Sequence, residues 1–408
     1  MTVGITNGVG SFLPLYINMA RTLLQEGHDV IWFWPTLEEK VLIRKYCPQV
    51  ICTVDAAGDV STLVKTERQF SGHVKAFYEL GIFSNKNKAY VHCLQRYSRA
   101  TDILRKYKIE RLVVFNGCTY PEADAAEDMD IPVWYLENGY FPNTFQCNRK
   151  GVNAKADFSN LTAEEFVNFS YQETSVGLHK TVNVRRCYTW YILSKLCNLV
   201  YFPKKEIVGL YNVYRQRRNQ KRNRNISKEI PRELPAKYLL YPLQCTQETQ
   251  LWLNSDFDSI ESTVEPVIRL AKRLGLPLIL KEHPADYMMH SYDRFASDEV
   301  FVTRVRDIDT LISGADAVVV MNSSTGLQAA GLYKPVLTFG KNMYTFLPNV
   351  TPINLHALEV ENISINTDFS KNEVDEIIKH FKKQIFIEGD WRNIKSDFIK
   401  RLAGRIVG

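Results

Sequence analysis

Short, almost wholly apolar runs alternate with helix-length segments along this chain, and no other feature limits its fold as strongly. The runs "KYLLYPLQ", "LPLIL", "ADAVVVM" and "KPVLTFG" follow one another in the second half, with amphipathic stretches between them. Strands that are apolar on both faces are typical of a parallel sheet covered by helices on each side. The second half therefore predicts a doubly wound α/β sheet.

The first half shows the same alternation. "TVGIT" leads through the glycine turn Gly8–Val9–Gly10 into a helical stretch from about residue 12 to 26, and the strand "DVIWFW" follows. "RLVVFNG" and "IPVWYLENG" are further apolar strands that end in polar, glycine-containing turns. Because 408 residues exceed what one small core needs, we expect two Rossmann-like α/β domains with a ligand cleft between them.

The composition changes along the chain and sets the expected domain limits. Residues 1–200 and 238–370 form the two α/β domains, 201–237 is a basic linker, and 371–408 is a helical segment. The linker has seven Lys and Arg residues from Arg215 to Lys228 and no acidic residue among them. It can be a solvated connector, a nucleic-acid site or a contact with an anionic membrane. Tyr211 and Tyr214 precede the charges instead of interleaving with them, which disfavours nucleic acid.

Several classes of protein are disfavoured by what the sequence lacks. The eight cysteines stand singly, so neither a zinc site nor a disulfide scaffold is indicated, and a reducing cytoplasm is expected. No signal peptide is visible at the start of the chain. The most apolar window, 187–202, is interrupted by polar residues and is shorter than the roughly 20 residues that span a bilayer. We expect a protein that is soluble or at most peripheral to a membrane.

Polar residues follow two apolar runs of the second half. The run "LPLIL" ends in Lys281, Glu282, His283 and Pro284, and "ADAVVVM" ends in "NSSTG", residues 322–326. Ligands of open α/β sheets bind beyond the carboxyl ends of strands, and helix starts bind anions. We expect the two groups to follow neighbouring strands and to converge on one phosphate. The alternatives are a solvated turn for the first group and simple helix capping for the second.

A carboxylate follows a strand of the first half. Glu137 ends "VWYL", and Asn138 and Gly139 form a tight turn after it. A carboxylate at the end of a strand is a candidate base or nucleophile, although it can also cap a helix or pair with an arginine. The loop with Gly8 and Gly10 lacks the third glycine of a dinucleotide fingerprint, so we do not expect NAD.

Five pieces of the sequence, taken together, point to a known family. They are "ENGY", "KGVN", "YPLQ", "KEHP" and "NSSTGLQAAGLYKPVLTFGKNMY", and they lie between Glu137 and Tyr344. In order and spacing they resemble the capsule polysaccharide biosynthesis family that contains the bacterial β-Kdo glycosyltransferases. The resemblance implies a GT-B-like fold, with the donor CMP-Kdo in the C-terminal domain and a glycan or glycolipid acceptor on the N-terminal side.

The resemblance also implies the reaction and its setting. Kdo would pass from CMP-Kdo to an acceptor in capsule, O-antigen or lipopolysaccharide synthesis, with retention giving a β linkage. The enzyme would be cytoplasmic, or peripheral at the inner face of the inner membrane through Arg215 to Lys228. No cofactor or metal is expected, since the three Asp-x-Asp pairs fall at helix edges and no His/Cys cluster has ligand spacing.

The predicted site residues, from the residue patterns and from the resemblance together, fall into three groups. The catalytic residues are Glu137 and His283. Those that bind the donor nucleotide and its phosphate are Gln244, Lys281, Glu282, His283, Pro284, Asn322, Ser323, Ser324, Thr325 and Gly326. Those on the acceptor side are Gly8, Gly10, Asn116, Asn138, Gly139 and Asn153.

One position departs from the family pattern. Asn138 stands where the relatives commonly have a second acid before the glycine, so the catalytic role belongs either to Glu137 or to a residue elsewhere. Two alternatives to Kdo transfer also remain open. One is a transferase with another CMP-ulosonic acid or a CDP-polyol as donor, and the other is a non-catalytic component of capsule assembly.

Overall fold

Two compact units make up the chain in this computed structural model. The structure describes residues 1–6, 10–54, 69–185, 188–201, 233–246, 248–284, 286, 292–304, 306–358 and 363–408, with single residues between 207 and 218. The first unit contains Met1–Asp157, Ser170–Ile207 and Phe381–Gly408, and the second contains Phe158–Phe169 and Val208–His380. Gly8 and most of the predicted basic segment, Arg215 to Lys228, lie outside the described residues.

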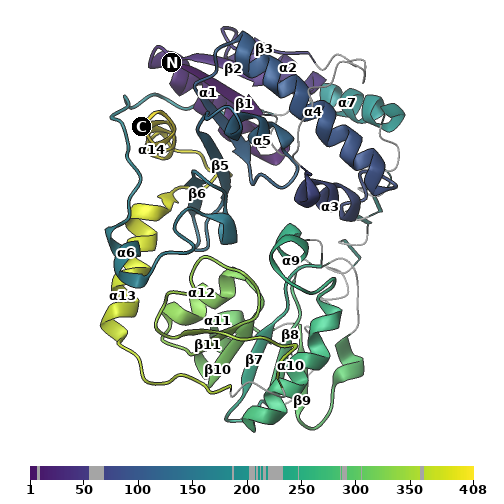
Figure 1. The fold of residues 1–408 in the computed structure, drawn as a ribbon, viewed down its shortest axis with the longest axis vertical. Coiled ribbons are helices and arrows are strands. Elements are labelled where there is room, and N and C mark those ends of the chain that lie inside the picture. The colour runs from purple at the N-terminus through teal and green to yellow at the C-terminus, as the bar shows by residue number, and fades with distance from the viewer. Residues whose placement is uncertain are drawn as a thin grey trace. The chain divides into compact units, whose positions relative to one another are not determined.

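The first unit is built on a mainly parallel sheet (Figure 1). Its strands are ordered β13-β6-β5-β4-β1-β2-β3, and only β6 and β13 run antiparallel to their neighbours. The order β3-β2-β1-β4-β5-β6 is that of a Rossmann fold. The strands are β1 Thr2–Thr6, β2 Asp29–Phe33, β3 Ile51–Cys52, β4 Arg111–Phe115, β5 Val133–Asn138, β6 Thr144–Asn148 and β13 Ile387–Glu388.

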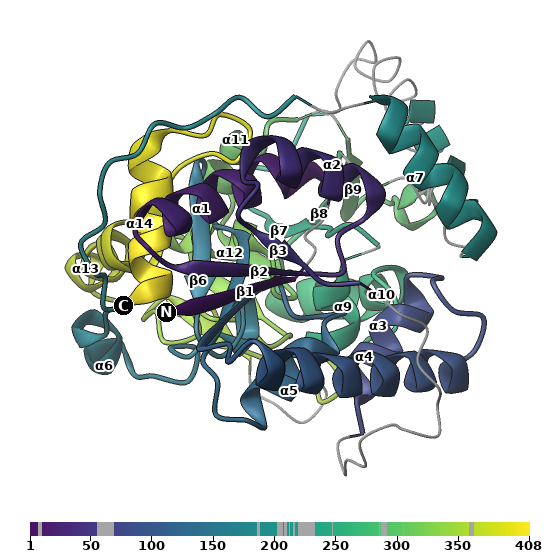
Figure 2. The same ribbon diagram turned by 90° about the horizontal axis from the view of Figure 1, so that it is seen from above.

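Helices cover both faces of this sheet. Figure 2 shows α1 and α2 on one face and α4 and α5 on the other. Their starts follow local rules: Pro14 lies in the first turn of α1, and Thr36 and Glu39 form a capping box at α2. The helices are α1 Leu13–Gln25, α2 Leu37–Tyr46, α3 Ser71–Glu79, α4 Lys86–Lys106, α5 Pro121–Glu127, α7 Tyr188–Tyr201 and α14 Ser396–Val407, with the short 3-10 helix η1 Gly10–Phe12 before α1.

The second unit has a fully parallel sheet in the order β12-β11-β10-β7-β8-β9. Counted from β7, this is again the Rossmann order. The strands are β7 Leu239–Pro242, β8 Leu278–Lys281, β9 Val300–Thr303, β10 Ala317–Val320, β11 Val336–Thr338 and β12 Val350–Pro352. Its helices are α6 Ala163–Asn168, α9 Thr249–Asn254, α10 Glu261–Leu274, α11 Ile308–Gly314, α12 Ser324–Gly331 and α13 Lys371–His380. The predicted fold class, α/β with two Rossmann-like domains, is confirmed by the two sheets.

The segment predicted to be helical, 371–408, contains helices α13 and α14 with the short strand β13 between them. Helix α13 belongs to the second unit, whereas β13 and α14 belong to the first. Strand β13 pairs with β6, and α14 packs on α1 with Phe398, Leu402 and Ile406 buried. Burial of this apolar face holds the segment against the first unit. None of the helices that the structure describes has the length and hydrophobicity needed to cross a membrane.

Candidate functional site

The strand order of the second unit reverses between β7 and β10. From β7 the chain builds outward to β8 and β9, and it then returns to β10 on the other side of β7. In open α/β sheets, ligands bind beyond the carboxyl ends of the strands at such a switch point. Gln244 follows β7 and Asn322 follows β10, so two residues predicted to bind the donor lie at the switch point.

Gln244 and Asn322 join the two loops at this point. The Gln244 Nε2 donates to Asn322 Oδ1 at 2.9 Å and to Glu248 Oε2 at 3.0 Å. The Asn322 Nδ2 in turn donates to the carbonyl of Gln250 at 3.2 Å. Both side chains are buried, so these bonds satisfy groups that water cannot reach. Burial also raises the pKa of Glu248, a residue that the sequence analysis did not single out.

The predicted "NSSTG" turn begins helix α12. Ser323 is the N-cap, and its hydroxyl accepts from the amide of Thr325 at 3.2 Å. Ser324, Thr325 and Gly326 form the first turn, and the Gly326 amide donates to the Ser323 carbonyl at 3.0 Å. The Tyr344 hydroxyl donates to the Ser323 carbonyl at 2.7 Å. A β-carbon at Gly326 would collide with that hydroxyl and would lie 2.8 Å from Val320, so the close approach requires glycine.

The predicted Lys281 and Glu282 hold the ends of β8 and β9. The Lys281 ammonium donates to the carbonyls of Glu282 at 2.9 Å and Arg304 at 3.0 Å, and burial lowers its pKa. The Glu282 carboxylate pairs with Arg304, 2.6 Å from Nε to Oε2. Arg304 also contacts Asp293 at 2.8 Å. Both charges therefore have protein partners, which supports a positioning role at the strand ends.

His283 and Pro284 follow directly in the loop after β8. Burial lowers the pKa of His283, against the opposing effect of Asp286, so the neutral imidazole is favoured near pH 7. Asp286 is itself buried and accepts from the Thr246 hydroxyl at 2.8 Å. This bond links the loop after β8 to the loop after β7. Neither Thr246 nor Asp286 was predicted, although both follow predicted residues closely.

The prediction that the His283 loop and the "NSSTG" turn follow neighbouring strands is wrong. Strand β7 lies between β8 and β10, because the first strand of a doubly wound unit is central. The carboxyl ends of β8 and β10 are therefore two strand spacings apart, about 10 Å. The loop that carries Gln244 therefore lies between the two groups.

The first unit has its own switch point, between β1 and β4. The loop after β4 turns sharply at Asn116 and Gly117, whose φ angles are +35° and +78°. The Asn116 amide donates to the carbonyl of Leu136 at 2.9 Å, and its side-chain Nδ2 lies 3.4 Å from Glu137 Oε2. The other carboxylate oxygen accepts from the Asn138 amide at 2.9 Å. The structure thus brings Asn116, Glu137 and Asn138 together, with the carboxylate half-buried at the sheet edge.

Gln146 joins two further predicted residues. It is fully buried on β6, and its Nε2 donates to the Asn138 carbonyl at 2.7 Å and to Asn153 Oδ1 at 3.0 Å. Its Oε1 accepts from the Asn153 amide at 3.1 Å. Gly139 bonds the Thr144 carbonyl at 2.8 Å, and a β-carbon there would collide with Thr144. Gln146 was not predicted; its signal in the sequence is an amide between the apolar residues Phe145 and Cys147.

Two helices fix the turn after β4. The amide of Cys118 donates to Asn116 Oδ1 at 3.0 Å. His73 on α3 lies between the Cys118 carbonyl, 3.0 Å from Nδ1, and Asp124 on α5, 2.6 Å from Nε2. His73 and Asp124 were missed because each is distant in sequence from the turn that it supports.

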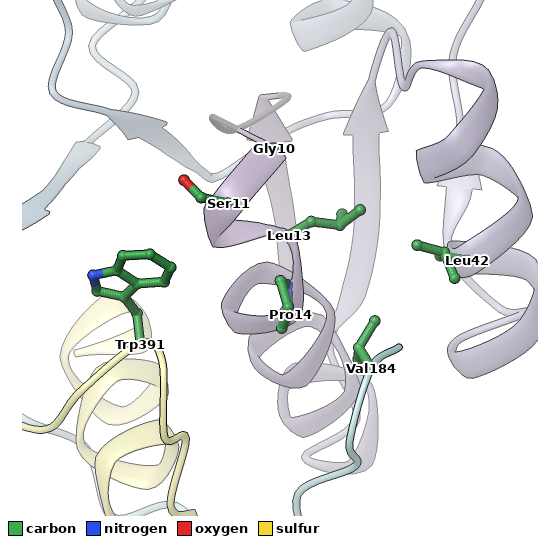
Figure 3. Close-up of a pocket in the computed structure, with 7 residues that line it drawn as sticks. All are labelled: Gly10, Ser11, Leu13, Pro14, Leu42, Val184 and Trp391. Atoms are coloured by element: carbon green, nitrogen blue, oxygen red, sulfur yellow. The ribbon is translucent and has the colours of Figure 1, made fainter. Parts of the chain in front are cut away.

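Gly10 borders a cavity of about 310 Å³ at the start of α1 (Figure 3). The lining is mostly apolar, and its residues are Gly10, Ser11, Leu13, Pro14, Leu42, Val184 and Trp391. Trp391 comes from the C-terminal segment, and its ring centroid lies 4.5 Å from that of Phe12. Of the predicted acceptor residues, Gly10 therefore adjoins a cavity, and Asn116 and Asn138 contact Glu137. Gly139 bonds Thr144, and Asn153 bonds Gln146, which in turn bonds the Asn138 carbonyl.

The two sheets and their polar switch points define a two-unit α/β protein of the Rossmann type. The sequence model of the family "Capsule polysaccharide biosynthesis protein" matches residues 118–352, more than half of the chain. This chain belongs to that family, so the predicted family membership is confirmed. Protein FixF of Sinorhizobium fredii is 25% identical over 246 residues, which are 59% of this chain and 51% of FixF. The chain thus spans about half the length of that curated relative.

Solved structures of low sequence identity align with most of the chain. Thermosulfurimonas dismutans KpsC, beta Kdo 2,7 transferase, is 16% identical, with 86% of this chain and 89% of that chain covered and a TM-score of 0.40. The beta Kdo 2,4 transferase of the same KpsC is 14% identical, with coverages of 72% and 88% and a TM-score of 0.38. Acinetobacter baumannii MurG is 12% identical, with coverages of 99% and 94% and a TM-score of 0.30.

Proposed function

We propose that this chain is a glycosyltransferase that moves Kdo, or a closely related sugar acid, from its CMP-activated form to a glycan or glycolipid acceptor. The observation that carries the proposal is at the second switch point. Gln244, Asn322 and the start of α12 meet there, at the place where α/β sheets bind nucleotides. Membership of the capsule polysaccharide biosynthesis family supports a role in the synthesis of a surface polysaccharide.

The donor side is suited to a phosphate that leaves. When the bond between the anomeric carbon and the phosphate oxygen breaks, the electron pair goes to the phosphate of CMP. The positive end of the dipole of α12, at Ser323 and Ser324, stabilises this charge. His283, neutral in the free protein, can take up a proton beside the phosphate. We propose that these groups serve without a metal or another cofactor.

The acceptor side offers one carboxylate at the sheet edge. The anomeric carbon of Kdo is fully substituted, so its transition state resembles an oxocarbenium ion, which a carboxylate stabilises or traps as an adduct. Glu137 is oriented for this by the Asn138 amide and by Asn116. We propose that Glu137 is the catalytic carboxylate and that the linkage formed is β, with retention. The setting that we propose is the cytoplasmic face of the inner membrane, with peripheral attachment.

Asn138 favours a second candidate function. Because an amide stands where the relatives commonly have an acid, the chain could instead be a binding component of capsule assembly without turnover. Replacement of Glu137 by Ala separates the two functions. An enzyme loses turnover and still binds CMP, whereas a binding component has no turnover to lose.

The first experiment measures the thermal unfolding midpoint of the purified chain in the presence of CMP, CDP, UDP or GDP. A ligand at about a hundred times its dissociation constant adds roughly 2.7 kcal/mol to the stability of the folded state. We expect selective stabilisation by CMP that is lost in His283→Ala and kept in His356→Ala, an exposed histidine of the same unit. Preference for CDP would favour a CDP-polyol donor, and preference for UDP or GDP would overturn the proposed donor. Turnover of CMP-Kdo, measured by release of CMP, then tests the reaction.

A further inference from the structure

Helix α7 turns apolar side chains to the solvent. Ile192, Leu196 and Leu199 are 56%, 55% and 41% exposed, and their spacing places them on one side of the helix. Leu193 and Trp190 are also exposed. The helix contacts α2 and projects from the margin of the first unit (Figure 2). These five residues, the α7 apolar face, form a stripe of the kind that a surface helix normally buries.

The chain after α7 continues the pattern and then becomes strongly cationic. Ile207, Leu210, Tyr211 and Tyr214 are exposed and repeat the helical spacing of three and four residues. The seven Lys and Arg residues from Arg215 to Lys228 follow. An exposed apolar helix face followed by a basic segment is typical of a helix that lies in the surface of an anionic bilayer.

We propose that the α7 apolar face inserts into an anionic lipid bilayer at the level of the headgroups. At 14 residues, α7 is about 21 Å long, shorter than a hydrocarbon core of about 30 Å, so it lies in the interface. A second copy of this chain is a poorer partner, because it would bring two sets of seven cations together. This inference rests on one part of the proposed function, the peripheral attachment to a membrane, and it names the helix that makes the contact. It does not depend on the identity of the donor.

The test uses the full chain and vesicles of phosphatidylcholine with or without phosphatidylglycerol. We expect co-sedimentation with the anionic vesicles only, weakened by salt and reduced at least tenfold in the triple variant Ile192→Ser, Leu196→Ser, Leu199→Ser. Matched controls are Leu178→Ser and Leu332→Ser, whose side chains are similarly exposed elsewhere on the chain. Lipids brominated in their acyl chains should quench tryptophan fluorescence, and Trp190→Phe should remove most of that quenching.

Three results would overturn the proposal. They are no binding to anionic vesicles, equal binding by the triple variant, and quenching that persists in Trp190→Phe. A concentration-dependent dimer in solution, lost in the triple variant, would identify a second copy as the partner instead. Binding of CMP, measured on the same variants without lipid, reports separately on the donor site and is expected to be unchanged.

Discussion

Gln244 and Asn322, 78 residues apart, are joined by a hydrogen bond of 2.9 Å across the switch point of the second sheet. Both side chains are buried, and each has further partners in the loops that it connects. The bond therefore fixes the loop after β7 against the start of α12. The geometry of the proposed phosphate site depends on this connection.

Asn322→Ala should lower both stability and affinity for CMP. The change leaves the Gln244 amide and the carbonyl of Gln250 short of a partner, at a cost of about 2 kcal/mol in the free energy of unfolding. A double-mutant cycle with Gln244→Ala, measured by denaturant unfolding, should give a coupling of at least about 0.5 kcal/mol. Additive effects would show that the two side chains act separately.

Gly326→Ala should destabilise the second unit through a collision. The new methyl group would meet the hydroxyl of Tyr344 and Val320, and the buried ring cannot move aside, so we expect a loss of about 1 to 3 kcal/mol. The double variant with Tyr344→Phe removes the colliding hydroxyl and should recover part of the loss. Gly331→Ala in the same helix is the control, because its nearest neighbour is 3.5 Å away. Thermal unfolding that is equally affected by both alanines would contradict this explanation.

Glu137→Gln should abolish transfer while the protein stays folded. The glutamine keeps the size of the side chain but removes the negative charge that faces the oxocarbenium-like transition state, so we expect at least a hundredfold loss in turnover. Asn138→Asp, which places an acid at the neighbouring position, tests the alternative position and should not rescue the Gln variant. Release of CMP from CMP-Kdo measures the turnover of each variant. Full activity of Glu137→Gln would place the catalytic group elsewhere.

The central strands of both sheets and their polar ends could be predicted from the sequence, because buried parallel strands are nearly continuous apolar runs. The outer strands β3, β6, β9, β12 and β13 were not predicted. The glycine turns were equally visible: Gly139 and Gly326 stand where a β-carbon would collide with a neighbour. The partners Gln146 and Tyr344 were not visible as such. Their contacts with Asn153 and Ser323 arise only when separate strands and loops come together.

The order of the strands within each sheet was the main feature that the sequence could not predict. A sequence lists β7, β8, β9 and β10 in succession, yet the chain places β7 in the centre, so His283 and Ser323 do not follow adjacent strands. The return of the C-terminal segment to the first unit is a similar case. It depends on an apolar face of α14 that fits α1, and periodicity alone does not say which helix such a face will meet.

The ion pair between Glu173 and Arg405 helps to hold the C-terminal helix α14 on the first unit, and it can be tested by changing the pH. Burial alone would raise the pKa of Glu173, but the hydrogen bond and charge of the fully buried Arg405 outweigh it, and the pKa is lowered. A lowered carboxyl pKa contributes stability that is present above about pH 4.5 and is lost as the pH falls through the folded value. Glu173→Gln should therefore cost about 2 to 3 kcal/mol at pH 7 and progressively less in acid. Glu164→Gln, an exposed position, should leave the thermal midpoint unchanged.

The protonation of His283 predicts how the thermal midpoint depends on pH with and without CMP. Burial holds its pKa below 6.5, so the unfolded chain binds the proton more readily and the stability from His283 is lost as the pH falls below about 6.5. Without ligand, the thermal midpoint should therefore fall more in the wild type than in His283→Gln between about pH 7.5 and pH 5.5. A phosphate beside the ring favours the imidazolium, so saturating CMP should reduce or reverse this difference. His356→Gln controls for the titration of CMP itself. If the difference between wild type and His283→Gln follows the same pH profile with and without CMP, His283 does not contact the phosphate.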